Sequence, residues 1–145
     1  LEKYEMSSAK SSELFSDTIP TLSRVKALGY KLGLITNTSK KATEYMFSQH
    51  GLKKFFDVVV TREDVRRFKP EPEGIQLALR KLGEKGFILV GDLRYDASAA
   101  EKAGGISIIL NRNPSKKLDF HADHTVRNLE EIVGIIQAAG RIKQN

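Results

Sequence analysis

Short apolar runs alternate along this chain with segments in which apolar residues recur at helical spacing. The helical spacing predicts helices at Thr18–Leu28, Lys40–His50, Glu73–Leu82, an Ala-rich segment that ends at Gly104, and Leu129–Ala139. The apolar runs predict strands at Tyr30–Thr36, Phe55–Thr61, Phe87–Val90, Ile106–Leu110 and, at an edge, His124–Val126. Strands that alternate with helices in this way form right-handed βαβ units. We therefore predict an α/β fold of Rossmann-like type, with a mostly parallel sheet and helices on both faces.

The length of 145 residues fits one compact domain that can bury a core. The first 12 residues are polar and Ser-rich, so we expect residues 1–13 to be a loosely ordered end or the tail of an upstream segment, and residues 14–145 to form the domain. The chain starts with Leu and not with Met. We therefore expect a fragment, a trimmed form or a processed product of a longer protein.

Composition narrows the classes of partner. The 24 Lys and Arg residues exceed the 18 Asp and Glu residues, which gives a net charge of +6 that is spread along the sequence. Nucleic-acid-binding proteins more often concentrate basic residues in a stripe with aromatic residues, so we expect no nucleic-acid partner. We interpret the charge as a solvated surface that also attracts anionic substrates. The absence of Cys fits a cytoplasmic location, and no apolar stretch is long enough for us to expect a membrane partner.

Two carboxylates follow the apolar run Phe87–Val90, a run typical of a strand that is buried on both faces of a parallel sheet. Asp92 comes directly after Gly91, and Asp96 lies four residues further along the chain. Neighbouring carboxylates raise each other's pKa, and a hard divalent cation such as Mg²⁺ relieves their repulsion. The same residues also fit a helix start, with Asp92 as N-cap and Asp96 as a solvated acid of the first turn. Both interpretations stay open at this point.

Polar residues also follow two other predicted strands. Thr36 and Asn37 end the first strand, and Lys69 lies in the loop after the Val-rich strand. Because ligands of open α/β sheets bind beyond the carboxyl ends of the strands, these residues and the two acids predict a phosphate-plus-metal site. The Thr36 hydroxyl and backbone N–H groups would hold phosphoryl oxygens, and Lys69 would neutralise them. The plainer alternatives are a Thr that only ends a strand and a Lys that is only solvated.

The segments LITNTS, KPEP and GDLRYD, in this order and spacing, resemble the second, third and fourth motifs of the haloacid dehalogenase superfamily. The resemblance runs from about residue 14 to the end of the chain. It implies a Rossmann-like hydrolase fold and, as for most members, a Mg²⁺-dependent phosphatase. The implied catalytic residues are Thr36 and Lys69, which bind phosphate with Asn37 beside them, and Asp92, a ligand of Mg²⁺. Asp96 would support the metal through water, and its presence is more typical of the phosphatases than of the dehalogenases.

The first motif of that family, an apolar strand that ends in Asp-x-Asp, has no counterpart here. Its aspartates are the nucleophile and the general acid–base, so we predict that this chain alone is inactive. Asp17, Asp57 and Asp119 do not replace them, because none of the three ends an apolar strand. The predicted function is that of a phosphatase of a small phosphorylated metabolite, present here without its nucleophile. The alternatives are a non-catalytic binding or scaffold module and, less well matched, a response-regulator-like receiver, which needs acidic residues early in the chain.

The family's strand order places the missing strand between the strands predicted at Tyr30–Thr36 and Phe87–Val90. An empty position there would leave backbone groups of two inner strands without ladder partners. It would also forgo the burial of about five apolar side chains, which is worth on the order of 10 kcal/mol. We therefore expect an upstream segment or a second chain to supply a strand, or the two flanking strands to pair directly. Of these, we favour an upstream segment.

Overall fold

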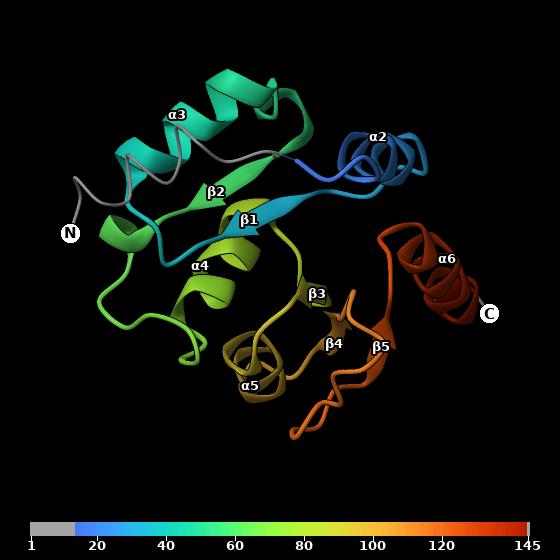
Figure 1. The fold of residues 1–145 in the computed structure, drawn as a ribbon. Coiled ribbons are helices and arrows are strands. Elements are labelled where there is room, and N and C mark those ends of the chain that lie inside the picture. Colours follow the sequence, from blue (N-terminus) through green and yellow to red (C-terminus); the bar gives the residue numbers. More distant parts are fainter. Residues whose placement is uncertain (1–13, 145) are drawn as a thin grey trace.

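The computed structural model describes residues 14–144, with side chains up to residue 140 (Figure 1). The loose end predicted at residues 1–13 lies outside the described range. The helices are α2 (Thr18–Ala27), α3 (Lys40–His50), α4 (Glu73–Leu82), α5 (Arg94–Lys102) and α6 (Glu130–Gln144). The strands are β1 (Gly33–Ile35), β2 (Val58–Val60), β3 (Ile88–Gly91), β4 (Ile106–Leu110) and β5 (His124–Val126). The short 3₁₀ turns η1 (Lys53–Phe55) and η2 (Arg62–Asp64) flank β2.

The strands form two parallel sheets, one with the order β1-β2 and one with the order β3-β4-β5. Leu34 of β1 pairs with Val59 of β2, and Leu89 of β3 pairs with Ser107 of β4. Parallel neighbours need a long crossover, and α3, α5 and the loop 111–123 provide these crossovers. The arrangement confirms the predicted α/β fold with parallel pairing.

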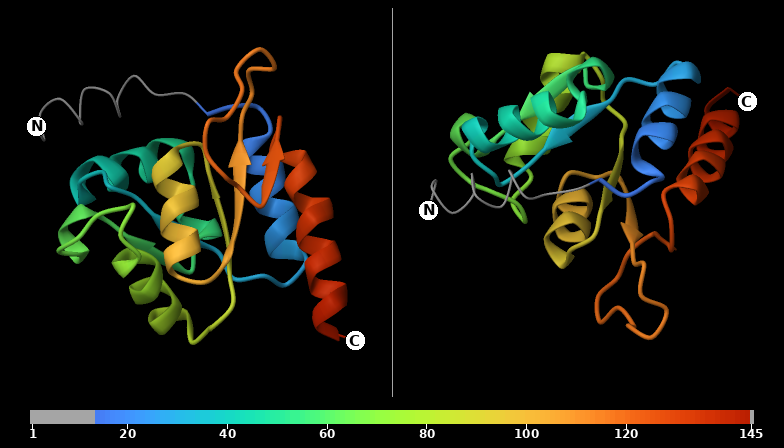
Figure 2. Two further views of the ribbon diagram at one scale, coloured as in Figure 1. Left: turned by 90° about the horizontal axis from the view of Figure 1, so that it is seen from below. Right: turned by 45° about the horizontal axis from the view of Figure 1, so that its top comes forward.

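Helices cover both sides of the strands (Figures 1 and 2). Helix α4 packs on β1 and β2 around a core of Val58, Val60 and Ala78, while α3 lies on the other side of these strands. Helices α2 and α6 pack on the second sheet, where Val25 and Ile108 belong to one buried cluster. Helix α5 lies on the opposite face of that sheet. The fold therefore has helices on both faces, as the alternating pattern predicts.

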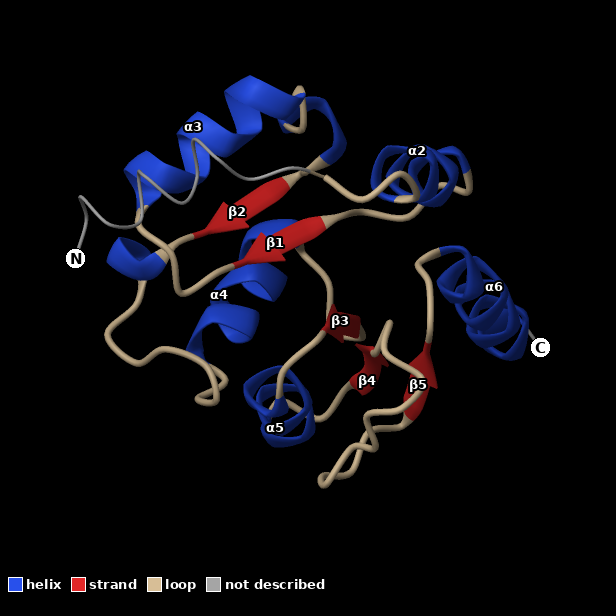
Figure 3. Cartoon of the chain, in the orientation of Figure 1, coloured by secondary structure: helices blue, strands red, loops and turns tan. Residues whose placement is uncertain are grey.

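The two sheets are not joined by strand pairing. In Figure 3, β1 is the strand of its sheet that lies nearer to β3, yet neither pairs with the other. Within residues 14–144, β1 and β3 therefore each have a ladder partner on one side only. None of their residues is buried, whereas β2 and β4 each contain buried residues. We call the facing, unpaired sides of Gly33–Ile35 and Ile88–Gly91 the inner edges.

Two predictions are wrong at the inner edges. The apolar run Phe87–Val90 predicts a strand buried on both faces, but Val90 is 39% exposed. The physical reason is that β3 has no neighbouring strand on its side facing β1, so the apolar side chains there lack part of their cover. The alternative in which the two flanking strands pair directly is also wrong.

Local capping explains why several helix bounds follow the sequence pattern so closely. The Oγ of Ser39 accepts the N–H of Ala42 at 3.2 Å and begins α3. Gly51 ends α3 and Gly83 ends α4, with φ of 65° and 68°, in the left-handed region that glycine adopts easily. The predicted bounds of α3, α4, β4 and β5 are confirmed.

The first two strands are shorter than the predicted runs. Tyr30 contacts α6 instead of extending β1, and its hydroxyl donates to the Ile136 carbonyl at 3.3 Å. The N–H of Leu32 donates to the carboxylate of Asp57 at 2.8 Å and not to a strand partner. Tertiary contacts therefore remove Tyr30 and the N–H of Leu32 from strand pairing, while the Leu32 carbonyl still accepts the N–H of Val58 at 3.4 Å.

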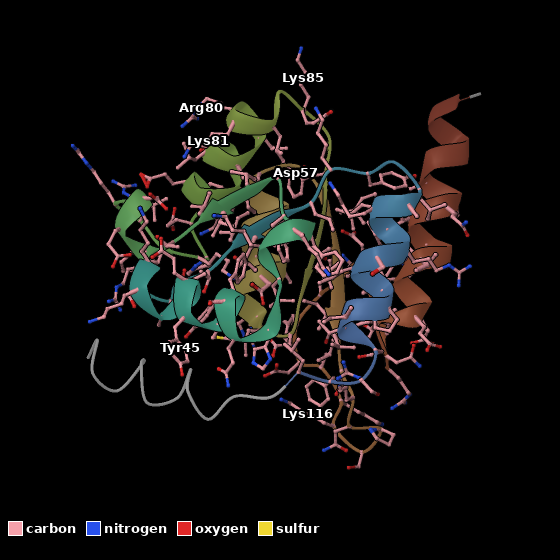
Figure 4. All side chains as sticks on the ribbon, turned by 90° about the horizontal axis from the view of Figure 1, so that it is seen from above. Tyr45, Asp57, Arg80, Lys81, Lys85 and Lys116 are labelled. Atoms are coloured by element: carbon pink, nitrogen blue, oxygen red, sulfur yellow. The ribbon has the colours of Figure 1, made fainter. Side chains whose placement is uncertain are left out.

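The positive charge is distributed over the surface. Figure 4 shows Arg80 and Lys81 around the end of α4, while Lys116 lies on the opposite side of that view. Some bases are paired, such as Lys26, whose ammonium lies 2.8 Å from the carboxylate of Asp57. Within residues 14–144, the structure contains no helix with the length and apolar character that a membrane span requires.

Candidate active site

The carboxyl ends of the inner strands carry the predicted site residues. Thr36 directly follows β1, Asp92 directly follows β3, and Asp96 lies in the first turn of α5. Lys69 extends toward them from the loop between η2 and α4. Hydrogen bonds link Asn37 to Lys69, Lys69 to Asp96, and Asp96 to the N–H of Asp92. The structure thus places residues from three separate loops in one connected network, which we call the carboxyl-edge network.

Lys69 and Asp96 form the central ion pair of this network. The Lys69 Nζ lies 2.6 Å from Asp96 Oδ1, and the two side chains are only 16% and 6% exposed. The other carboxylate oxygen, Oδ2, accepts the N–H groups of Asp92 and Leu93, each at 3.1 Å. These donors belong to the N-terminal end of α5, where the helix dipole favours a negative charge. Removing one partner of such a buried pair typically costs about 3–5 kcal/mol, because the other charge stays buried.

Gly91 is the residue that permits this position of Asp96. A Cβ atom added at position 91 would overlap the Asp96 carboxyl group. The carboxylate therefore lies directly against the end of β3, within reach of the backbone N–H groups that follow. Glycine is needed here for close approach, since the space of a side chain is occupied by the functional group.

Thr36 both ends its strand and retains a free donor. Its N–H donates to the Val60 carbonyl at 2.9 Å, and its Oγ1 accepts the N–H of Thr38 at 3.0 Å. Thr36 therefore does end the strand and begin a turn. In the described contacts the Oγ1 is an acceptor, so its hydroxyl proton is available to a phosphoryl oxygen. The predicted phosphate contact of Thr36 stays a prediction.

A residue that sequence reasoning missed occupies the N-terminus of α3. The Glu63 carboxylate accepts the N–H of Lys40 at 2.8 Å and the hydroxyl of Thr61 at 3.3 Å. The Lys40 hydrogen bond is the main reason why the pKa of Glu63 lies below its ordinary value. This N–H is thus already bound by an anion of the chain and is unavailable to phosphate. No local signal identifies Glu63, because the residues are 23 positions apart.

The helix-start interpretation of the two acids is partly wrong. The N-cap of α5 is Leu93 and not Asp92, and Asp96 is buried instead of solvated, although it does lie in the first turn. Asp92 is exposed. A side chain that caps no helix and remains open to solvent is available for another ligand.

The donors at this edge fit a magnesium ion only in part. The exposed Asp92 carboxylate is the kind of oxygen ligand that Mg²⁺ prefers, together with water molecules. The part of the chain that the structure describes contains no group of three or more His, Cys, Asp or Glu side chains that could hold a metal ion. The two carboxylate oxygens of Asp96 together accept three hydrogen bonds. A carboxylate has about four acceptor sites, so Asp96 keeps about one for a further ligand. Asp92 and Asp96 as metal residues therefore stay predictions, and a complete site would need a further ligand.

Comparison with known proteins identifies relatives of two kinds. Pyrophosphatase PpaX of Bacillus cereus (strain AH820) is 37% identical over 94 residues, which cover 63% of this chain and 44% of that protein. The (S)-2-haloacid dehalogenase of Pseudomonas putida is 33% identical over 122 residues, which cover 81% of this chain and 54% of that protein. The chain therefore spans about half the length of these curated relatives.

Solved structures and a family model agree with these relatives. The crystal structure of a HAD phosphatase from Thermococcus onnurineus matches with a TM-score of 0.82 and 33% identity, over 93% of this chain and 63% of that chain. A 2-haloacid dehalogenase from Pseudomonas syringae pv. Tomato DC3000 matches with a TM-score of 0.74 and 26% identity, over 88% of this chain and 55% of that one. The family model described as haloacid dehalogenase-like hydrolase matches residues 1–110. The resemblance in the three motifs is thereby confirmed, and this chain belongs to the haloacid dehalogenase-like hydrolase family.

Proposed function

We propose that this chain carries most of the active site of a phosphohydrolase that acts on a small phosphorylated metabolite. The observation that supports the proposal is the Lys69 ammonium, held 2.6 Å from Asp96 at the same edge as the Thr36 hydroxyl. A fixed cation beside a hydroxyl donor suits the binding of phosphoryl oxygens, because preorganised charges need no rearrangement during the reaction. Relatives named as a pyrophosphatase and a HAD phosphatase support the same class.

Each residue has a distinct role in this proposal. Thr36 donates its hydroxyl proton to a phosphoryl oxygen, and Lys69 neutralises the negative charge that the phosphoryl group carries. Asp96 holds Lys69 in place. Asp92 is a ligand of Mg²⁺, which would supply further neutralisation of the phosphoryl oxygens. Asn37 lies beside the phosphate.

No described residue is assigned as the nucleophile, and we propose that an upstream segment supplies it on a strand between β1 and β3. Within residues 14–144, their inner edges have backbone groups without ladder partners and partly exposed apolar side chains, which are the two features that an added parallel strand would satisfy. A carboxylate at the carboxyl end of that strand would lie near Lys69 and Asp92. It would attack phosphorus and displace the alcohol oxygen, and water would then release inorganic phosphate.

Two other functions compete with this proposal. One relative is named as an (S)-2-haloacid dehalogenase, so the first competitor is a dehalogenase, which acts on a haloacid and not on a phosphate ester. The pair Asp92 and Asp96 favours the phosphatase over the dehalogenase. A non-catalytic module of the same fold is the second competitor, since no described residue of this chain is assigned as nucleophile.

Turnover of p-nitrophenyl phosphate with Mg²⁺ distinguishes these functions. We expect no turnover by the 145-residue chain alone, and turnover by a longer protein that includes the natural upstream sequence. In the longer protein, Asp92→Asn should remove most of the activity, whereas Asp119→Asn, an exposed acid on a different loop, should not. Mg²⁺-dependent turnover by the chain alone that Asp92→Asn abolishes would contradict the need for an added nucleophile. An inactive longer protein would favour the non-catalytic module, and release of halide from a 2-haloacid would favour the dehalogenase.

A further inference from the structure

The side chain of Asn37 pairs with the backbone of Lys69 in an unusual way for a residue of a binding loop. Its Nδ2 donates to the carbonyl of Lys69, and its Oδ1 accepts the N–H of the same residue, each at 3.3 Å. The two residues are 32 positions apart, so this pairing is purely tertiary. One planar amide thus binds both backbone polar groups of Lys69, much as the backbone of a neighbouring strand would.

We propose that Asn37 is a positioning residue, whose side chain fixes the backbone of Lys69 and thereby sets where the Lys69 ammonium lies. The inference rests on the proposed function, in which Lys69 binds phosphate, and it assigns to the side chain of Asn37 a role other than contact with that phosphate. The group that acts is the carboxamide, through its donor and its acceptor together.

The need for such a clamp follows from the loop on which Lys69 lies. The loop runs from Val65 to Pro72 without a strand or helix, and several of its residues are exposed. Another side-chain link from this loop, Glu71 to Lys102, joins side chains that are 42% and 45% exposed. Exposed ion pairs contribute little to order. The Glu73 carboxylate holds the start of the loop through the N–H groups of Arg66 and Arg67, but among the described contacts only Asn37 binds the backbone of Lys69 itself.

The clamp also completes a connection between the two sheets. Asn37 follows β1, and its partner Lys69 is bound through its ammonium to Asp96, whose other oxygen binds the N–H groups that follow β3. The carboxyl-edge network therefore runs from the end of β1 to the end of β3 through Lys69. Side chains make this connection at the place where the described strands β1 and β3 do not pair with each other.

The chemistry of the clamp makes a specific demand on position 37. Alanine offers neither the donor nor the acceptor. An ionised aspartate keeps the acceptor but turns a second negative oxygen toward the Lys69 carbonyl, where a donor is required. A protonated aspartic acid has both groups again, so Asn37→Asp should recover the clamp as the pH falls below about 4.

Nuclear magnetic resonance of the 145-residue chain tests the proposal directly. In Asn37→Ala we expect the Lys69 amide to lose protection from hydrogen exchange roughly fivefold to tenfold, with a broadened signal of the Lys69 ammonium. The amides of two buried residues, Val60 and Ile109, report global stability and should not change to the same extent; these residues are 1% and 0% exposed.

The matched control is Asn111→Ala in another loop. The Asn111 side chain also binds two backbone groups, the Lys116 carbonyl and the Asn113 N–H. That control should leave Lys69 unchanged.

The Asn37→Asp variant gives the second readout. The shifts of the Lys69 carbonyl and amide should depart from those of the wild-type chain at pH 6–7 and return toward them below about pH 4, each compared at equal pH. Unchanged Lys69 protection in Asn37→Ala, or shifts in Asn37→Asp that never return on acidification, would overturn the proposal.

Titration with inorganic phosphate separates this inference from the proposed function. If phosphate shifts the Thr36 and Lys69 signals in the wild-type chain, Asn37→Ala should weaken that binding several-fold, and undiminished binding would contradict the role in positioning for phosphate. If the wild-type chain binds no phosphate, the predicted phosphate site fails on its own terms. The exchange and shift measurements would still decide whether Asn37 positions Lys69.

Discussion

The inner edges of β1 and β3 and the carboxyl-edge network above them differ in what holds them. Along the inner edges the described residues make no strand pairs, and Val90 is 39% exposed. At the carboxyl edge, by contrast, Asn37, Lys69 and Asp96 connect the same two sheets, and the side chain of Asp96 is only 6% exposed. The polar part of the site is therefore assembled where the apolar part of the sheet is incomplete.

This difference has a physical origin. A ladder needs two backbones about 4.8 Å apart over several residues, so a missing strand cannot be replaced by side chains. A long lysine and a carboxylate need to meet at only one point, and loops can bring them there. Order at a candidate active site therefore does not require a complete sheet below it.

The largest effect should come from supplying a strand. A peptide with about five apolar residues followed by Asp-x-Asp should raise the melting temperature by roughly 5–10 °C when present at 100 times its Kd, since such binding adds about 2.7 kcal/mol. The driving force is the cover given to the inner edges, where β1 and β3 have no buried residue. Differential scanning fluorimetry and light scattering would measure the shift and the oligomeric state.

A peptide with Pro at its centre is the matched control, because it lacks a ladder donor. It should bind far more weakly. A stable monomer whose melting temperature neither peptide changes would show that the inner edges need no strand.

Two valines, one on a well-covered strand and one at an inner edge, should differ in their contribution to stability. Val60 of the paired strand β2 is 1% exposed, so Val60→Ala should cost roughly 1.5–3 kcal/mol through lost burial and a cavity. Val90→Ala at the inner edge should cost less than about 1 kcal/mol, because the side chain is 39% exposed. Urea unfolding at constant m-value would measure both. Equal losses in the free energy of unfolding would mean that the inner edge is as well covered as the core. When the strand peptide is bound, the loss should increase for Val90→Ala but not for Val60→Ala.

Two glycines should respond with opposite signs. Gly91→Ala should destabilise by about 1–3 kcal/mol, because its Cβ meets the Asp96 carboxyl group and would force it away from Lys69. Gly134 lies in α6 with no atom within 4 Å of an added Cβ, so Gly134→Ala should stabilise by roughly 0.5–1 kcal/mol. Thermal or urea unfolding would compare them. A neutral Gly91→Ala would mean that Asp96 is not confined against β3.

The smallest effect concerns a link outside the inner edges. Asp17, just before α2, binds the guanidinium of Arg112 at 2.9 and 3.1 Å and the N–H of Leu129 at 2.9 Å. The Arg112 hydrogen bond is the main reason why the pKa of Asp17 lies below its ordinary value. A lowered carboxyl pKa contributes stability that is present above the unfolded pKa, about 3.9, and is lost as the pH falls through the lower folded value.

Asp17→Asn should therefore reduce the loss of stability on acidification below about pH 4, relative to the wild-type chain. Urea unfolding between pH 3 and 6 would measure this difference. Four other carboxylates with lowered pKa values also contribute to the change of stability with pH: Asp57, Glu63, Asp64 and Asp123. Only the difference between Asp17→Asn and the wild-type chain therefore reports on Asp17. Parallel curves would contradict the contribution of Asp17.

Much of the fold was predictable from the sequence because its signals are local. Ser39 as N-cap and Gly51 and Gly83 as helix ends each act within a turn, and the bounds of α3 and α4 follow from them. The run Ile106–Leu110 is rich in β-branched residues, which favour strands, and it forms β4, which pairs with β3 and β5. The order of the three motifs, by resemblance, also located Thr36, Lys69 and Asp92 at one edge.

The order of strands and helices, the class of fold and the loops that carry polar residues follow from the amino-acid sequence, since these depend on periodicity and on residues close together in the chain. How the side chains pair emerges only in the folded chain. Asn37 binds the backbone of Lys69, Glu63 occupies the N-terminus of α3, and within residues 14–144 β1 and β3 do not pair with each other; each of these relations joins residues at least 23 positions apart. Such partners leave no periodic signal, because their proximity is set by the packing of whole elements and not by the conformation of neighbouring residues.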